Sequence, residues 1–214
     1  MSAFQLLTLA VCLVLIAAVV KNTNFPAMLS DKQAQHRIFG AATALFVLWL
    51  FRVSIHDGMV LQFLGLTAFT LILGFRWAVI TSVLVLVAIT LIEGESFYDV
   101  GIIGLCGVVM PIVFSYTVYT LTFHKMPKHL FTYIFACGFF PAAVSIALKM
   151  LLMSGYYYYS DMYTWDIIYD GYVQLIWLLM FQEAFFNGMV ITCLVVYKPQ
   201  WLYTYNDKFY LDGK

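Results

Sequence analysis

Long apolar segments separated by short polar stretches dominate the sequence. A helix needs about 20 apolar residues to cross the hydrocarbon layer of a bilayer. The chain offers seven such segments, roughly at residues 3–20, 38–55, 58–74, 76–93, 99–123, 129–153 and 168–197. The pattern predicts an all-α fold, a polytopic transmembrane helical bundle of about seven spans. The third and fourth segments are short and joined only by "GFRW", which indicates a tight helical hairpin that can be partly re-entrant.

The composition leads to the same class of protein. Hydrophobic residues make up 64% of the chain and charged residues 10%, with a mean hydropathy of +0.91, whereas a soluble domain carries about a quarter charged residues. Little sequence remains outside the spans, so we predict a single integral membrane domain over residues 1–214. Basic residues follow the first apolar segment rather than precede it, which favours a retained helix over a signal peptide. A net charge of zero, without a basic cluster, gives no indication of a nucleic-acid partner.

The charged residues alternate between the loops. Basic residues follow the first, third, fifth and seventh segments; they are Lys21, Lys32, Arg37, Arg76, Lys125, Lys128, Lys198, Lys208 and Lys214. Acidic residues fill the other loops; they are Asp57, Glu93, Glu95, Asp99, Asp161, Asp166 and Asp170. The positive-inside rule then predicts the N-terminus outside and the C-terminus inside. Arg52 and Lys149 are the exceptions, and Lys149 is expected to snorkel from the sixth span to the outer interface.

Two polar residues lie within the last apolar segment, in "MFQEAFFNGMV". Glu183 is near its middle, and Asn187 follows one turn later on the same helix face. Burying an ionisable group at membrane depth costs at least a few kcal/mol, which makes such a residue a candidate for function. Two interpretations stay open. The pair either forms interhelical hydrogen bonds that hold the bundle together, or provides a carboxylate that faces a ligand or handles protons.

A second polar group interrupts the apolar pattern in "SIHDGMVLQFLG", residues 54–65. His56 and Asp57 lie at the outer end of the second segment, where they can cap a turn or contribute to a metal site. Gln62 lies inside the third segment, where a single amide commonly makes an interhelical hydrogen bond. The four cysteines, Cys12, Cys106, Cys137 and Cys193, are far apart in apolar runs and are expected to be packing residues.

A family resemblance begins in this second polar group. Residues 58–111 combine spaced glycines with an acidic loop between Glu93 and Asp99; the glycines are Gly58, Gly65, Gly74, Gly101, Gly104 and Gly107. Near the end, "QEAFFNGMVITCLVVY" places Glu183 in a helix that also contains glycine. These features resemble the substrate-binding membrane subunit of cobalt/nickel energy-coupling-factor transporters, the CbiM-like permeases. The resemblance covers about two thirds of the chain, and its motifs are mostly glycines.

This resemblance implies a transport function in the bacterial inner (plasma) membrane. The subunit would capture a transition-metal cation, Co²⁺ or Ni²⁺, at the outer face for ATP-driven uptake with other membrane subunits and an ATPase. His56, Asp57 and Gln62 would be the metal ligands, with Glu183 and Asn187 orienting them or sensing occupancy. The chain has no Gly-x-x-x-x-Gly-Lys phosphate loop, so we expect no enzyme activity of its own.

Two departures from the family pattern leave alternatives open. The family begins with Met-His, whereas this chain begins "MSAFQ", and Gln62 stands where the family has histidine. An imidazole is a good ligand for cobalt and nickel, and a neutral amide oxygen is a poor one. The alternative is therefore an accessory or structural subunit of a larger membrane complex, which has lost the metal site. A third possibility is a carrier of the same shape for another small molecule.

Overall fold

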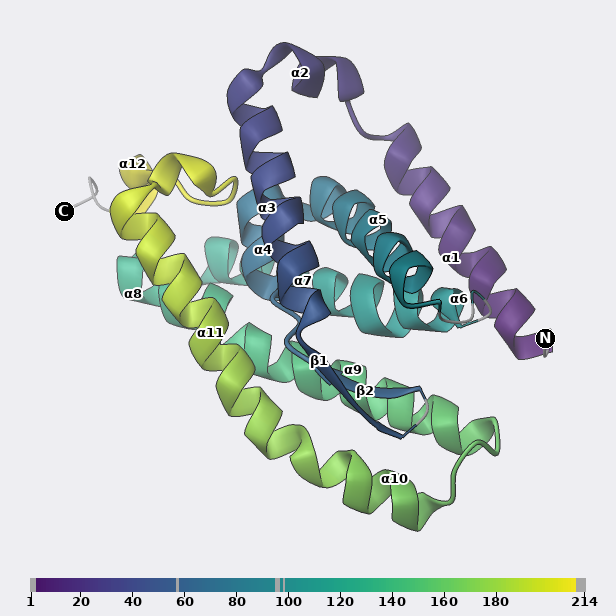
Figure 1. The fold of residues 1–214 in the computed structure, drawn as a ribbon. Coiled ribbons are helices and arrows are strands. Elements are labelled where there is room, and N and C mark those ends of the chain that lie inside the picture. Colours follow the sequence, from purple (N-terminus) through teal and green to yellow (C-terminus); the bar gives the residue numbers. More distant parts are fainter. Residues whose placement is uncertain (1–2, 57, 95–96, 98, 211–214) are drawn as a thin grey trace.

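The structure is a computed structural model, and it describes residues 3–56, 58–94, 97 and 99–210. Figure 1 shows a bundle of helices with a small β-hairpin that follows α3. The longer helices are α1 (Ala3–Lys21), α3 (Lys32–Leu50), α5 (Phe75–Glu93), α7 (Met110–Lys125), α9 (Phe140–Tyr159) and α11 (Ile176–Tyr197). The shorter ones are α2 (Phe25–Ser30), α4 (Leu66–Leu73), α6 (Val100–Ile102), α8 (Leu130–Thr132), α10 (Trp165–Gly171) and α12 (Asp207–Tyr210).

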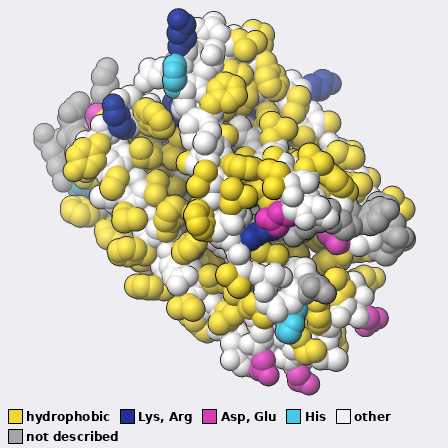
Figure 2. Space-filling view, viewed as in Figure 1, with side chains coloured by type: hydrophobic (Ala, Val, Ile, Leu, Met, Phe, Trp, Pro, Cys, Tyr) yellow, Lys and Arg dark blue, Asp and Glu magenta, His cyan; other side chains and the backbone are white. Residues whose placement is uncertain are grey.

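Five continuous helical stretches of the described chain are long and apolar enough to cross a membrane. They are Phe4–Lys21, Phe75–Glu93, Val100–Lys125, Leu130–Tyr159 and Trp165–Tyr197. These correspond to the first, fourth, fifth, sixth and seventh predicted segments, so the prediction of an apolar helical membrane bundle is confirmed. Hydrophobic side chains cover most of the face seen in Figure 2, as expected for a surface that contacts lipid.

The predicted membrane helices at 38–55 and 58–74 are not continuous helices in the structure. Helix α3 begins in polar sequence and ends at Leu50, after which β1 (Arg52–His56) and β2 (Met59–Gln62) form an antiparallel hairpin. Arg52 pairs with Gln62 at its base and His56 with Met59 near its tip. An Asp-Gly dipeptide between runs rich in β-branched residues is a strong hairpin signal, and counting apolar length overlooked it.

Helix α4 is the central element of the bundle. It has eight residues, all of them buried, so it is about 12 Å long and cannot cross a bilayer. It packs against α3, α5, α7, α9 and α11. Its C-terminal carbonyls are satisfied by the chain after α11, where the Tyr203 N–H donates to Ile72 O (3.1 Å) and the Thr204 hydroxyl to Leu71 O (2.9 Å). Irregular backbone is tolerated at membrane depth when protein surrounds it in this way.

Two of the spanning helices contain a π-helical segment immediately before a proline. The segments are η1 (Ile103–Val109), followed by Pro111, and η2 (Tyr133–Phe139), followed by Pro141. Proline lacks an N–H and clashes with the carbonyl four residues earlier, and a wider turn relieves that clash. The first segment, η1, carries Gly107 into the interior of the bundle, where a Cβ would contact the Lys149 stem at 3.9 Å.

Helix α1 packs against the bundle through two glycines. A Cβ on Gly101 would lie 2.6 Å from the Leu9 backbone, and one on Gly104 would lie 3.0 Å from Cys12 Sγ. Most of α1 otherwise faces outward, since only 11% of the residues in its apolar stretch are buried inside the protein. Figure 1 shows this helix along one edge of the molecule. Its position therefore depends on close backbone contact.

We predict that Gly101→Ala displaces α1 and lowers stability by about 1–3 kcal/mol, because the added methyl group overlaps backbone that cannot move aside alone. Labelling of the buried Cys12 thiol should then begin at a lower temperature than labelling of buried Cys137. Gly155→Ala is the matched control, because nothing lies within 4 Å of a Cβ at Gly155. Equal behaviour of the two variants would show that α1 does not depend on this contact.

Candidate functional site

A cavity of about 320 Å³ lies beneath the hairpin at one end of the bundle. Its walls come from the hairpin, the end of α3, α5, η1 and α9; the lining residues include Trp49, Gln62, Ile89, Val108, Lys149 and Met153. Val60 and Gln62 both line it because alternate residues of a strand face the same side. The volume falls at the lower end of the range for small-molecule sites, and the mainly apolar lining with a few polar groups is typical of them.

Lys149 is the buried cation of this cavity. Only 7% of its side chain is exposed, and Nζ donates one hydrogen bond, to Val60 O at 3.3 Å. The same nitrogen lies 5.9 Å from the centre of the Tyr172 ring. The expectation that Lys149 snorkels to the interface is therefore wrong: the side chain ends inside the protein, against the hairpin.

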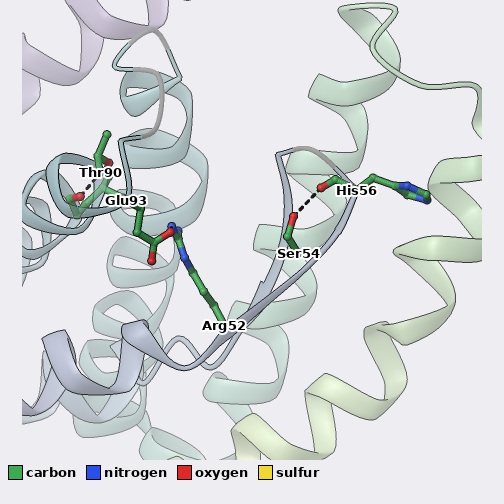
Figure 3. Close-up of polar contacts among 6 residues, drawn as sticks. Arg52, Ser54, His56, Thr90 and Glu93 are labelled. Atoms are coloured by element: carbon green, nitrogen blue, oxygen red, sulfur yellow. Dashed lines mark hydrogen bonds and ion pairs between the residues drawn. The ribbon is translucent and has the colours of Figure 1, made fainter.

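Two carboxylates with defined partners lie near the cavity. Arg52 at the base of the hairpin forms an ion pair with Glu93 at the end of α5, and Figure 3 shows the two side chains meeting between these elements. Asp99 Oδ1 accepts hydrogen bonds from the Tyr156 hydroxyl (2.8 Å) and from Gln5 Nε2 (3.0 Å). Asp99 thus links α1 to α9, and the Arg52–Glu93 pair links the hairpin to α5.

Two aromatic side chains hold the hairpin over the cavity. The Tyr157 hydroxyl donates to Gly58 O at 2.6 Å, and Trp49 Nε1 donates to Leu64 O at 3.0 Å. The first bond fixes the tip of the hairpin to α9, and the second fixes the chain just after β2 to α3. Because both polar atoms are occupied, the rings present apolar faces to the cavity.

Glu183 and Asn187 hold the start of α4. The Glu183 carboxylate accepts the N–H groups of Leu64 (2.9 Å) and Gly65 (2.6 Å), while Asn187 Oδ1 accepts the Ala68 N–H (2.8 Å). Asn187 Nδ2 also donates to Glu183 Oε1 at 2.8 Å. Both residues are almost completely buried. The hydrogen bonds match the structural interpretation of this pair, since they occupy the carboxylate with backbone groups outside the cavity lining.

The residues predicted as metal ligands lie in different places. His56 is exposed beside Tyr163, with ring centres 5.7 Å apart, and in Figure 3 it points away from Arg52 and Glu93. Gln62 lines the cavity, and Asp57 lies outside the described residues. In the part of the chain that the structure describes, no three His, Cys, Asp or Glu side chains gather closely enough to hold a metal. The metal-binding role of His56, Asp57 and Gln62 stays a prediction.

Sequence reasoning did not identify the remaining cavity residues. Lys149 offered a signal, because it is the one charge in the long apolar stretch between Leu130 and Tyr159. Trp49 and Tyr157 offered none, since aromatic residues at span ends usually belong to the interfacial belt. The four cysteines are free; Cys12 and Cys137 are buried as expected of packing residues, whereas Cys106 is half-buried and Cys193 is exposed.

These features define an integral membrane protein whose helical bundle holds a mainly apolar cavity with a few polar groups in its lining. The family model described as CbiM, cobalt uptake substrate-specific transmembrane region, matches residues 2–201 of the chain. The chain therefore belongs to this family of transport components. No curated protein and no solved structure matches it.

We predict that Glu183→Ala lowers the unfolding free energy by about 3 kcal/mol or more. The substitution leaves two buried N–H groups before α4 without an acceptor, and each costs about 1–3 kcal/mol. Glu183→Gln keeps one acceptor oxygen and should cost less. Thermal unfolding followed by labelling of buried Cys137 measures both variants, with Gln182→Ala on the adjacent, half-buried residue as control. A Glu183→Ala variant as stable as this control would contradict the structural role.

Proposed function

We propose that this chain is the substrate-binding membrane subunit of an uptake system and that the cavity beneath the hairpin is its substrate chamber. The observation that carries the proposal is the cavity itself, which joins a hydrophobic wall to a few charged and amide groups at one end of the bundle. Such cavities are the usual form of small-ligand sites. Membership of a cobalt uptake family supports the same function.

The proposed orientation places the N-terminus outside and the C-terminus inside. In Figure 2, most Asp and Glu side chains gather toward the lower and right parts of the molecule, and several Lys and Arg side chains lie at the upper edge. This separation of charges supports the orientation through the positive-inside rule. The cavity, which is lined by Asp99 and Arg52, then lies at the outer end and receives substrate from outside.

Uptake against a gradient requires an energy source that this chain does not itself supply. The sequence has no phosphate-binding Gly-x-x-x-x-Gly-Lys loop, which supports a separate ATPase and a membrane coupling subunit as partners. The broad hydrophobic surface that includes Trp177, Phe181 and Phe185 of α11 is available for lipid and for such a subunit. The bacterial inner membrane is the compartment that this arrangement favours.

The cargo we propose first is a cobalt or nickel cation captured near the hairpin by His56, Asp57 and Gln62. A second candidate function is an accessory subunit without a metal cargo. Gln62 favours it, because an amide stands where the family pattern has a stronger imidazole ligand.

Uptake of radioactive Co²⁺ separates these two functions. In cells that produce the chain together with its coupling subunit and ATPase, we expect accumulation several-fold above cells that carry an inactive ATPase. We expect His56→Ala to reduce it and Gln62→His to increase it, because imidazole binds Co²⁺ better than an amide does. Gln174→Ala, on an exposed pair with Asp170, is the control. No accumulation by the wild-type chain, with accumulation restored by Gln62→His, would support the accessory function instead.

A further inference from the structure

Lys149 is placed where an ammonium group is costly. It lies within a membrane-spanning helical stretch, Leu130–Tyr159, and intramembrane cations mark ligand pathways or pair with carboxylates. No carboxylate among the described residues forms an ion pair with it. Of the three donors of an ammonium group, one makes the 3.3 Å bond to Val60 O. Lys149 therefore lies in this cavity with no ion-pair partner among the described residues.

The other charged groups near the cavity already have partners. The Arg52 guanidinium is paired with Glu93, and Asp99 accepts two hydrogen bonds on one oxygen. Glu183 interacts with Lys149 through its charge, but its oxygens are engaged by the backbone before α4 and by Asn187. The lining itself includes two cationic side chains, Arg52 and Lys149, and one carboxylate, Asp99. Lys149 is the member whose charge a ligand can best neutralise.

We infer that this cavity takes a small organic anion, with its negative group at Lys149. The inference rests on the proposed function for the chamber alone, and it replaces the cobalt or nickel cation with an organic anion as the ligand of the cavity. The Gln62 amide lines the cavity together with Lys149 and can hydrogen-bond the ligand, while Trp49, Ile89 and Met153 provide an apolar wall for its carbon skeleton. A bare inorganic anion would leave that wall unused.

The same arrangement disfavours a bare divalent cation inside the cavity. At an effective dielectric constant of about 20, two unit charges about 8 Å apart interact by about 2 kcal/mol, and a divalent ion doubles that repulsion. His56 lies outside the cavity lining. A metal cargo would therefore be held at the hairpin surface or enter the cavity as an anionic complex.

Charge-selective labelling tests the inference without a known substrate. Val60→Cys places a thiol in the cavity wall beside Lys149, in a chain that also carries Cys106→Ala and Cys193→Ala. We compare its reaction with an anionic methanethiosulfonate (ethylsulfonate) and a cationic one (ethyltrimethylammonium). Each rate is divided by the rate of that reagent with free cysteine, after subtraction of labelling in the same chain without Val60→Cys. We expect the anionic reagent to be favoured about tenfold or more, as one nearby charge at intermediate dielectric implies.

Two variants assign the selectivity to Lys149. Lys149→Met keeps the length of the side chain without its charge, and we expect the preference to fall at least threefold; Lys149→Arg should retain it. Thermal unfolding of each variant checks that the bundle is intact. The anionic ligand class is rejected if the ratio of the anionic to the cationic labelling rate is one or less, or if Lys149→Met leaves that ratio unchanged. In either case the proposal that the cavity is the substrate chamber still holds. If neither reagent reacts with Val60→Cys, the cavity does not admit solutes, and both the chamber and the anion are rejected.

Discussion

The hydrogen bonds from Glu183 and Asn187 to the start of α4 are the constraint on which the rest of the structure depends. A short helix inside a membrane protein leaves backbone groups without partners at both ends, and no water is present in the hydrocarbon layer to satisfy them. Glu183 and Asn187 accept three N–H groups on one side. The chain after α11 supplies donors on the other. Both sets of partners thus come from the last spanning helix and the segment that follows it.

Anchoring α4 also fixes the position of the hairpin that covers the cavity. Three residues separate β2 from α4, so holding Leu64 and Gly65 determines where the hairpin ends. Gly65 has φ +64°, and a Cβ there would lie 2.9 Å from Leu48 Cδ2, so the turn into α4 needs glycine both for its conformation and for its close approach to α3. Trp49 then bonds Leu64 O from α3, and Tyr157 bonds Gly58 O from α9. A carboxylate that does not line the cavity therefore still determines its shape.

The sequence was sufficient to predict the five long helices and the polar pair in α11, because continuous apolar length and spacing on one helix face are local properties. The hairpin was missed because Val53, Ile55 and Val60 count toward apolar length whether they form a helix or a strand. The Asp57-Gly58 dipeptide is the local signal that favours a hairpin here. Lys149 was misjudged through a boundary error: α9 continues to Tyr159, so Lys149 lies ten residues, or about 15 Å, from its end. A lysine stem cannot cover that distance.

The positions of Gln62 and Lys149 together explain how a cobalt-uptake fold can carry an unusual site. Both residues line the same cavity. Gln62 brings a neutral amide, which is a poor ligand for cobalt or nickel, and Lys149 brings a basic side chain, so neither favours a bare cation in the cavity. The α4 anchor is built from Glu183, Asn187 and the chain after α11 rather than from these two side chains, although Lys149 also donates to Val60 O of the hairpin. The scaffold can therefore keep the family's architecture while the few side chains that face the cavity set the charge of what it admits, because function in such folds depends on the site rather than on the fold.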